Sequence, residues 1–363
     1  MNIYFLTDGI SEEFRKGETT LELTNHPNLD SICSRGYIGL YEPSRRPFLP
    51  NPETYVIYPF FFGLKPENNP GRAGLELIGE GVDIEKFPNL FIYRIISKDY
   101  DVRKGWDKAP RVQNEEEVFK VIEMMKEEFK ETTRTIKSTI GSKGNIWCVG
   151  SNGKESLEDY INWLQFEISK LGYNCYPALF QDYISGHSEV KRPTTLYGWS
   201  KGSLPQALKM VGVKLNQTID IDEIDMFNYP KKTKDFKERI LPLLKIKQDK
   251  DESAIIFIKE TSNASRKRTR QEKINAIGFI DNMIGFTLEE MGGNTNIIVL
   301  SDHQSNIGIE RTYQGPTNYG YARIKDKPSR QIRFTERLAW GETQEIKTQP
   351  EVIDGIEQFI RSQ

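Results

Sequence analysis

The two segments that decide the fold are NIYFLTDG at residues 2–9 and NIIVLSDH at residues 296–303. Each begins with a short, nearly continuous run of apolar, β-branched and aromatic residues, which is typical of a buried strand in a parallel sheet. An acidic residue follows each run, Asp8 in the first and Asp302 in the second, and His303 comes next. Because ligands of open α/β sheets bind beyond the carboxyl ends of the strands, the two segments predict a metal site at that edge. Either aspartate by itself could instead start a loop or cap a helix.

The composition narrows the class of protein. A chain of 363 residues is long enough for a core domain and a second module, because single cores stop growing near ~250–300 residues. Fifty basic and 52 acidic residues give a net charge of −2, which argues against a nucleic-acid or membrane-surface protein that acts through bulk charge. The start of the chain has no leader-like segment and no apolar run reaches the ~18 residues of a membrane span, so we expect a cytoplasmic protein.

Cysteine and histidine are both scarce. The three cysteines, Cys33, Cys148 and Cys175, are widely spaced and odd in number, which fits reduced thiols rather than a disulfide framework or a zinc ribbon. The histidines are His26, His187 and His303, so a two-metal site rich in imidazole would need all three to converge. His26 and His187 occur in turn-like contexts, where we expect them at the surface.

The patterns along the chain indicate a core with an insertion. Short apolar runs at 37–40, 55–58 and 90–93 alternate with turn-rich loops in the first part of the chain. Apolar residues at three- and four-residue spacing then predict amphipathic helices at 115–138 and 157–171.

A strand is predicted between these helices at 145–149, and strand and helix patterns resume at 254–258 and 272–290. We therefore predict an α/β fold with two parts. Residues 1–97 and 196–363 form the core, and residues 98–195 form a smaller inserted α/β lid domain.

The order of the motifs resembles the alkaline phosphatase superfamily, and within it the archaeal-type cofactor-independent phosphoglycerate mutase family. Asp8-Gly9 followed by TNHPNLD at 24–30 resembles the opening of that family, in which the first aspartate binds metal. GRAGLE at 71–76 resembles its glycine-arginine-glycine segment, and YGWSKG at 197–202 its tryptophan-glycine segment. Asp302-His303 resembles its aspartate-histidine pair. The resemblance implies an alkaline phosphatase-like core, with a central, mostly parallel sheet flanked by helices.

The resemblance also implies a nucleophile. The family uses a serine just before an apolar run that ends in glycine, and the corresponding position here is Thr54. Several branches of the superfamily use a threonine hydroxyl as both nucleophile and metal ligand. A metal-bound hydroxyl loses its proton more easily and can attack phosphorus. Thr54 could also be an ordinary loop threonine.

The second metal site of the family departs from its pattern in this chain. Ser262 stands at the position of an aspartate and Arg266 at that of a histidine, while Thr312 or Tyr313 takes the place of the last histidine. Both ligands of the segment around residue 262 are therefore replaced.

What remains is one oxygen-rich site with a single imidazole, which suits one divalent ion, Mn²⁺, Zn²⁺ or Mg²⁺. The residues implied as its metal ligands are Asp8, Thr54, Asp302 and His303.

Two hypotheses follow for the function. In the first, the protein is a metal-dependent phosphohydrolase or phosphotransferase that acts on a small phosphorylated metabolite, with Thr54 as nucleophile. Arg266 then supplies the positive charge of the missing metal, because a guanidinium fork matches two phosphoryl oxygens. Arg72, Arg94 and Lys267 are further candidates for substrate binding, although a buried ion pair is the commoner role of such arginines and a solvated basic turn that of such a lysine. In the second hypothesis, the chain is an inactive phosphoglycerate mutase-like pseudoenzyme that serves as a binding or scaffold protein.

Overall fold

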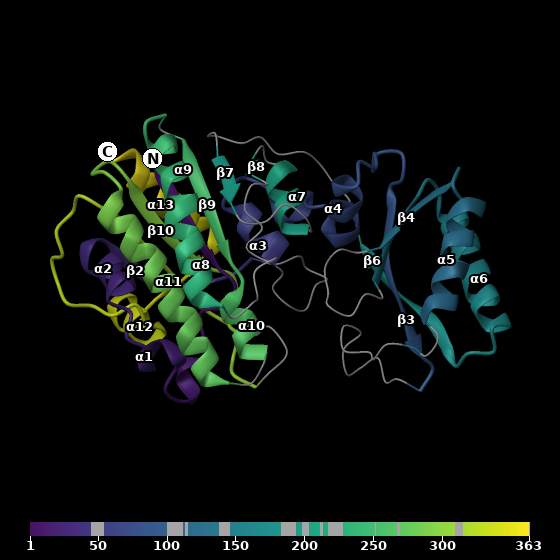
Figure 1. Cartoon of the computed structure of the whole chain (residues 1–363), viewed down its shortest axis with the longest axis horizontal. Coiled ribbons are helices and arrows are strands. Elements are labelled where there is room, and N and C mark those ends of the chain that lie inside the picture. Colours follow the sequence, from purple (N-terminus) through teal and green to yellow (C-terminus); the bar gives the residue numbers. More distant parts are fainter. Residues whose placement is uncertain are drawn as a thin grey trace. The chain divides into compact units, whose positions relative to one another are not determined.

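The chain forms two compact units in a computed structural model, shown in Figure 1. The first unit comprises Met1–Pro66, Glu189–Ser200 and Leu208–Gln363, and the second comprises Glu67–Ser188 and Lys201–Ala207. The structure describes residues 1–44, 54–99, 112, 115–137, 146–182, 194–197, 203–210, 213–216, 228–250, 252–266, 269–308 and 315–362.

An eight-stranded sheet forms the centre of the first unit. Its strands, in spatial order, are β12 (Ile346–Thr348), β2 (Tyr37–Glu42), β11 (Thr317–Arg323), β10 (Asn296–Ser301), β1 (Asn2–Thr7), β9 (Ser253–Ile258), β7 (Thr194–Tyr197) and β8 (Lys214–Asn216). Strand β1 pairs in parallel with β10 and β9, whereas β11 is antiparallel to both of its neighbours. The pairings of β12 with β2, of β7 with β9 and of β7 with β8 are parallel as well, so five of the seven pairings between the described strands are parallel. The prediction of a mostly parallel central sheet is confirmed.

Strand β1 explains how the sheet is covered on both faces. Ile3 and Phe5 point to one face and belong to a hydrophobic cluster shared with Ile277 and Ile280 of the long helix α11 (Arg270–Glu290). Tyr4 points to the opposite face, where its ring lies 5.0 Å from that of Phe62. A strand buried on both faces is apolar throughout rather than alternating, as its sequence shows.

The helices of the first unit complete these layers, and α8, α9 and α11 lie over the same face of the sheet in Figure 1. They are α1 (Thr20–Leu23), α2 (Pro27–Arg35), α3 (Thr54–Phe60), α8 (Tyr229–Asp235), α9 (Leu241–Gln248), α10 (Glu260–Arg266), α11, α12 (Glu336–Thr343) and α13 (Gln349–Arg361). A π-helical turn, Phe236–Ile240, joins α8 to α9. Helix α7 (Ser203–Met210) crosses the boundary between the units.

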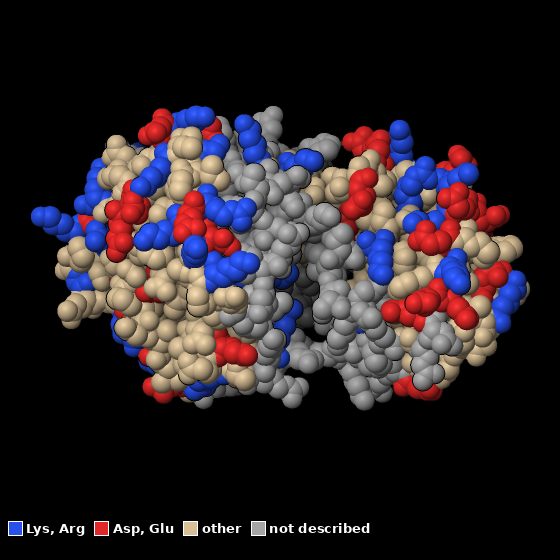
Figure 2. Space-filling view, viewed as in Figure 1, with Lys and Arg blue, Asp and Glu red and all other residues tan. Residues whose placement is uncertain are grey.

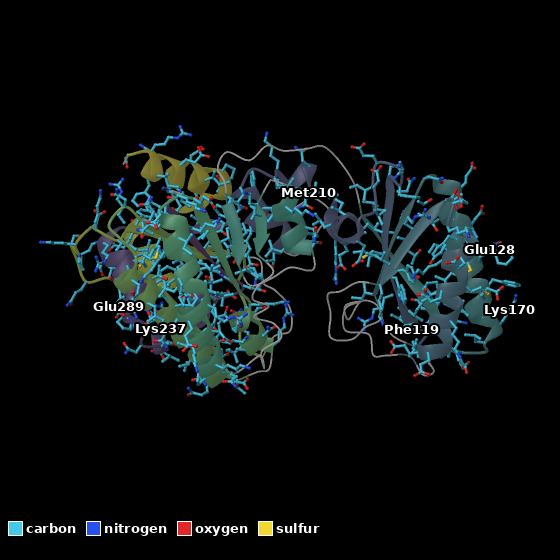
Figure 3. The ribbon with its side chains drawn as sticks, turned by 45° about the horizontal axis from the view of Figure 1, so that its top comes forward. Phe119, Glu128, Lys170, Met210, Lys237 and Glu289 are labelled. Atoms are coloured by element: carbon cyan, nitrogen blue, oxygen red, sulfur yellow. The ribbon has the colours of Figure 1, made fainter. Side chains whose placement is uncertain are left out.

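A four-stranded sheet forms the centre of the second unit, in the order β4 (Thr133–Lys137), β5 (Ile146–Ser151), β3 (Asn89–Ser97) and β6 (Cys175–Asp182). All of its pairings are antiparallel. The amphipathic helices α5 (Glu115–Glu128) and α6 (Lys154–Lys170) pack on it, and Phe119, Glu128 and Lys170 mark them in Figure 3. The unit also contains α4 (Gly71–Gly79).

The second unit begins earlier in the chain than the insertion expected at 98–195. Strand β3 belongs to it because β3 pairs with β5 and β6, and α4 belongs to it as well. The helix predicted at 115–138 ends at Glu128, since the alternating Thr133, Thr135 and Lys137 form strand β4 instead. The apolar run at 55–58 lies in helix α3.

The surface of the chain agrees with its small net charge. Acidic and basic side chains are interspersed over the face shown in Figure 2. Among the helices that the structure describes, none combines the length and apolar character of a bilayer span.

Candidate metal centre

Three potential metal ligands converge at the carboxyl edge of the eight-stranded sheet. One ligand atom each from Asp8, Asp302 and His303 lies within 4.8 Å of the others. The Nε2 atom of His303 is 2.9 Å from Oδ1 of Asp8 and 3.6 Å from Oδ2 of Asp302. All three residues are at most 4 % exposed. The sequence prediction that these residues meet is correct.

The register of two parallel strands brings the aspartates together. Thr7, the last residue of β1, lies opposite Ser301, the last residue of β10, so Asp8 and Asp302 leave adjacent strands at the same level. Gly9 then turns the chain with a φ of 67°, and its backbone N–H donates to Oδ1 of Asp302 at 3.1 Å. A Cβ atom at this position would lie 2.6 Å from Cβ of Ser305, so the turn requires glycine.

The orientation of His303 suits a cation between the ligands. Its Nδ1 atom lies 3.0 Å from the backbone oxygen of Gln304, and a proton on Nδ1 donates to that oxygen. The lone pair of Nε2 then faces the two carboxylates, an arrangement that is favourable only when a positive charge lies between them. Metal-ligating histidines typically donate their other N–H to a backbone carbonyl in this way. The residues therefore fit a divalent metal ion.

The charges of the site support this interpretation. Burial alone lowers the pKa of His303, but the charges of Asp302 and Asp8 outweigh it and raise this pKa to about 9. Burial, together with the charge of Asp8, raises the pKa of Asp302 to about 6. Burial also acts to raise the pKa of Asp8, but His303, Arg266 and Lys259 reverse that effect and lower it. The site thus stabilises a positive charge beside Nε2 of His303.

Thr54 lies next to this cluster. It is the first residue of α3, and its hydroxyl donates to Oδ2 of Asp302 at 2.6 Å. One helical turn further along, the hydroxyl of Tyr58 donates to the backbone oxygen of Leu300 at 3.3 Å. The hydroxyl of Tyr41, from β2, donates to the backbone oxygen of Ser301. These contacts fix α3 and the end of β10 relative to each other, so that Thr54 faces Asp302.

Helix α10 follows β9 at the same edge and carries Ser262 and Arg266, the two positions at which the resemblance implies replaced ligands. Ser262 is buried, and its hydroxyl has no hydrogen-bond partner among the described residues. Arg266 ends the helix with an exposed side chain, and its charge contributes to the lowered pKa of Asp8. Thr312 and Tyr313 fall outside the described residues.

The remaining candidates lie in the second unit or outside the described residues. Arg72 lies on α4, where its Nε atom is 3.2 Å from Oε1 of Glu76. Arg94 lies on β3 and is buried. Helix α4 and strand β3 both belong to the second unit, and so do these two arginines. Lys267 and His187 lie outside the described residues.

Two buried polar residues, His26 and Lys273, differ from what the sequence suggested. His26, expected at the surface, is fully buried, because its two ring nitrogens each lie 2.8 Å from an oxygen, of Asp30 and of Leu21. Lys273 of α11 was not anticipated at all and is also fully buried. One signal could have revealed it, since Lys273 shares the apolar spacing of Ile277, Ile280 and Ile284 on this helix.

Comparisons with known proteins agree with the fold. No protein-family profile matches the chain. A 2,3-bisphosphoglycerate-independent phosphoglycerate mutase of Methanopyrus kandleri is 30% identical over 118 residues, which cover 31% of this chain and 27% of that protein. The match thus spans about a quarter of this curated relative.

Two solved structures are similar over almost their whole length. The PH0037 protein from Pyrococcus horikoshii superposes with a TM-score of 0.64 at 18% identity, covering 100% of this chain and 97% of that one. The cofactor-independent phosphoglycerate mutase from Thermoplasma acidophilum gives a TM-score of 0.56 at 14% identity and covers 99% of both chains. The chain therefore has the cofactor-independent phosphoglycerate mutase fold that its motifs resemble.

Proposed function

We propose that this chain is a metal-dependent phosphoryl-transfer enzyme, a phosphohydrolase or phosphotransferase that acts on a small phosphorylated metabolite. One divalent ion is held by Asp8, Asp302 and His303, with the hydroxyl of Thr54 beside it. The observation that carries the proposal is the 2.6 Å contact between Oγ1 of Thr54 and Oδ2 of Asp302, at the edge of the buried cluster. The fold shared with a phosphoglycerate mutase supports it.

The donor set indicates which ions the site accepts. Carboxylate and hydroxyl oxygens with one imidazole nitrogen suit Mn²⁺, Zn²⁺ or Mg²⁺. When bound, such an ion supplies positive charge that eases deprotonation of a hydroxyl and neutralises phosphoryl oxygens. The cysteines Cys33, Cys148 and Cys175 are buried and are not joined in disulfides, which supports a reducing compartment and hence the cytoplasm as part of the proposal.

Thr54 is the nucleophile in this proposal. Its hydroxyl already donates to Asp302, so the proton points to a carboxylate that can accept it, while the oxygen lone pairs remain for attack on phosphorus. The attack forms a phosphothreonine and breaks the bond to the leaving alcohol, which takes up a proton. Water or a second alcohol then accepts the phosphoryl group and restores the Thr54 hydroxyl.

Arg266 binds the transferred phosphoryl group. It is exposed at the end of α10, close enough for its charge to lower the pKa of Asp8. A guanidinium can contact two phosphoryl oxygens at once and stabilise the charge of the transition state. We do not propose phosphoglycerate mutase activity itself, because Ser262 and Arg266 replace two ligands of the second ion that the mutase family uses as a clamp.

The test is the variant Thr54→Ala, with Thr54→Ser as its matched control. On a panel of small phosphate monoesters, we expect Thr54→Ala to lose about 10³-fold or more in kcat/KM and Thr54→Ser to retain activity, with both variants folded. Acid quenching of wild type during turnover, followed by mass spectrometry, should find phosphate on Thr54.

Full activity of Thr54→Ala would contradict the proposed nucleophile. Absence of turnover by wild type across the panel, with no phosphorylated Thr54, would favour a pseudoenzyme that binds a partner instead.

A further inference from the structure

A buried lysine contacts two loops, the one that follows Asp8 and the one that follows His303. Lys273 of α11 is 0% exposed, and its Nζ atom lies 3.0 Å from Oε1 of Glu12. The same ammonium donates to the backbone oxygen of Ser305 at 2.7 Å. We propose that Lys273 is a positioning residue that sets the distance between the loop carrying Asp8 and the loop carrying Asp302 and His303. This inference rests on the proposed function, since it concerns the same site.

Glu12 fixes the first loop on which Lys273 acts. It belongs to the segment that follows Asp8, and its carboxylate accepts hydrogen bonds from the backbone N–H of Thr20 at 2.8 Å and its hydroxyl at 2.7 Å. The backbone N–H of Glu12 donates to Oε1 of Glu336 at 2.7 Å, and the hydroxyl of Thr19 donates to the other oxygen of Glu336. Glu12 is therefore held rigidly at both its backbone and its side chain.

Ser305 fixes the second loop. Its backbone oxygen accepts hydrogen bonds from Lys273 and, at 2.9 Å, from the hydroxyl of Ser265 at the end of α10. Its N–H donates to the backbone oxygen of Ser11 at 2.8 Å, beside a bridge between Ser11 and Gln304. Ser305 also lies directly against Gly9, as the close approach at that glycine shows. Lys273 thus joins a side chain of the Asp8 loop to the main chain of the His303 loop.

The charges around Lys273 explain why its loss should affect both loops. Glu12 and Glu336 face the ammonium, and Arg270, one turn earlier on α11, is the opposing positive charge. Removing one partner of a buried ion pair leaves an uncompensated charge, which is far more costly than removing the whole pair. Without Lys273, the carboxylates of Glu12 and Glu336 repel each other and the backbone oxygen of Ser305 loses a donor. Both loops can then shift, and the ligand atoms of Asp8 and His303 shift with them.

The experiment compares Mn²⁺ binding to the full-length wild type and to Lys273→Met, which keeps an unbranched side chain of similar volume. Free Mn²⁺ is counted by electron paramagnetic resonance during titration. We expect one Mn²⁺ per wild-type chain and an affinity about 10-fold or more lower in the variant, the usual size of effects on groups that orient metal ligands.

The matched control is Asp281→Asn, a second buried polar residue two turns further along the same helix. Asp281 accepts hydrogen bonds from the backbone N–H groups of Asn28 and Leu29 at 2.9 and 2.8 Å, at the start of α2, and does not contact either ligand loop. This variant should unfold at lower denaturant concentration than wild type while it binds Mn²⁺ with unchanged affinity. If Lys273 positions the ligands, Lys273→Met should weaken Mn²⁺ binding, whereas a variant that only lowers the stability of the fold, Asp281→Asn, should not.

A milder variant, Ser265→Ala, removes the other donor to the Ser305 carbonyl and tests the same connection if Lys273→Met does not fold. We expect its Mn²⁺ affinity to fall about threefold, because Lys273 still holds the loop. Wild-type affinity in a folded Lys273→Met, or in Ser265→Ala if the former does not fold, would overturn the positioning role and leave the metal site standing. No Mn²⁺ binding by wild type would overturn the proposed function and this inference together.

Discussion

Two neighbouring parts of one sheet edge differ in the chemistry they offer. The ends of β1 and β10 carry Asp8, Asp302 and His303, which are buried and turned toward one another. The end of β9, on the other side of β1, leads into α10, which carries the hydroxyls of Thr261, Ser262 and Ser265 and ends at the exposed Arg266. One part suits a metal cation and the other suits an anion, so the edge as a whole suits a phosphoryl group that bridges the two.

The hydroxyls of α10 contact the main chain that follows β1 and β10. The Thr261 hydroxyl donates to the backbone oxygen of Asp8 at 2.5 Å, and the Ser265 hydroxyl donates to that of Ser305 at 2.9 Å. These residues hold the main chain of the ligand loops and offer nothing to a second ion. The comparison teaches that α10 holds the main chain at Asp8 and Ser305 by hydrogen bonds and places the positive charge of Arg266 near Asp8.

The largest expected change comes from restoring ligands to α10. In the double variant Ser262→Asp, Arg266→His, the end of β9 regains a carboxylate and an imidazole, and the positive charge of Arg266 is lost. We expect bound Zn²⁺ to rise from one equivalent per chain toward two, as measured by elemental analysis after desalting. A double variant that folds and still binds one equivalent would show that the two parts of the edge differ by more than these side chains.

A smaller effect is expected when only the positive charge of α10 is removed. Arg266→Ala should lower kcat/KM for a phosphate monoester about 10- to 100-fold, because one charge-assisted contact to the phosphoryl group is lost. Arg266→Lys should recover part of the rate, since a lysine keeps the charge but cannot contact two oxygens in a fork. Metal content should stay at one equivalent in both variants. Equal kcat/KM values for wild type and Arg266→Ala would show that Arg266 does not contact the phosphoryl group in the reaction.

The smallest effect concerns a histidine outside the edge and sharpens the contrast with His303. Burial lowers the pKa of His26, but Asp30 and the backbone oxygen of Leu21 reverse this and raise it above the ordinary 6.5. The folded protein therefore binds this proton more tightly than the unfolded chain does. The resulting stabilisation is complete below about pH 6.5 and is lost as pH rises through the pKa of folded His26.

Chemical denaturation at a series of pH values measures this contribution. Between about pH 6 and about pH 9, the free energy of unfolding of wild type should fall by about 1.5–3 kcal/mol more than that of His26→Gln, which is the usual contribution of a hydrogen bond to a charged group. The variant should bind metal as wild type does. If the free energy of unfolding depends on pH in the same way for both proteins, protonation of His26 does not stabilise the fold.

The convergence of Asp8, Asp302 and His303 could be predicted because its signals are local in the sequence. The apolar runs of β1 and β10 end directly at Asp8 and Asp302, and parallel pairing alone brings such residues together. Thr54 is predicted as nucleophile from a motif resemblance. In the structure its hydroxyl lies beside Asp302, and its role is part of the proposal.

Other features depend on contacts that are distant in the sequence. The run at 55–58 is apolar enough for a strand or a buried helix. In the structure it forms part of helix α3, and Tyr58 of that helix packs against Phe257 of β9. The place of β3 depends on its pairing with β5 and β6, which no local pattern reveals. Lys273 looks like an ordinary helix lysine until Glu12 and Ser305 are brought to it by the fold.

The most direct test of the central claim is the metal content of the purified full-length protein after reconstitution and desalting. It should be measured by elemental analysis for wild type, Asp302→Ala and the control Asp281→Asn, whose aspartate is also buried but lies outside the centre. We predict one equivalent of divalent metal per chain in wild type and in Asp281→Asn, and none in Asp302→Ala. A wild-type protein that retains no metal, or an Asp302→Ala variant that retains a full equivalent, would contradict the account.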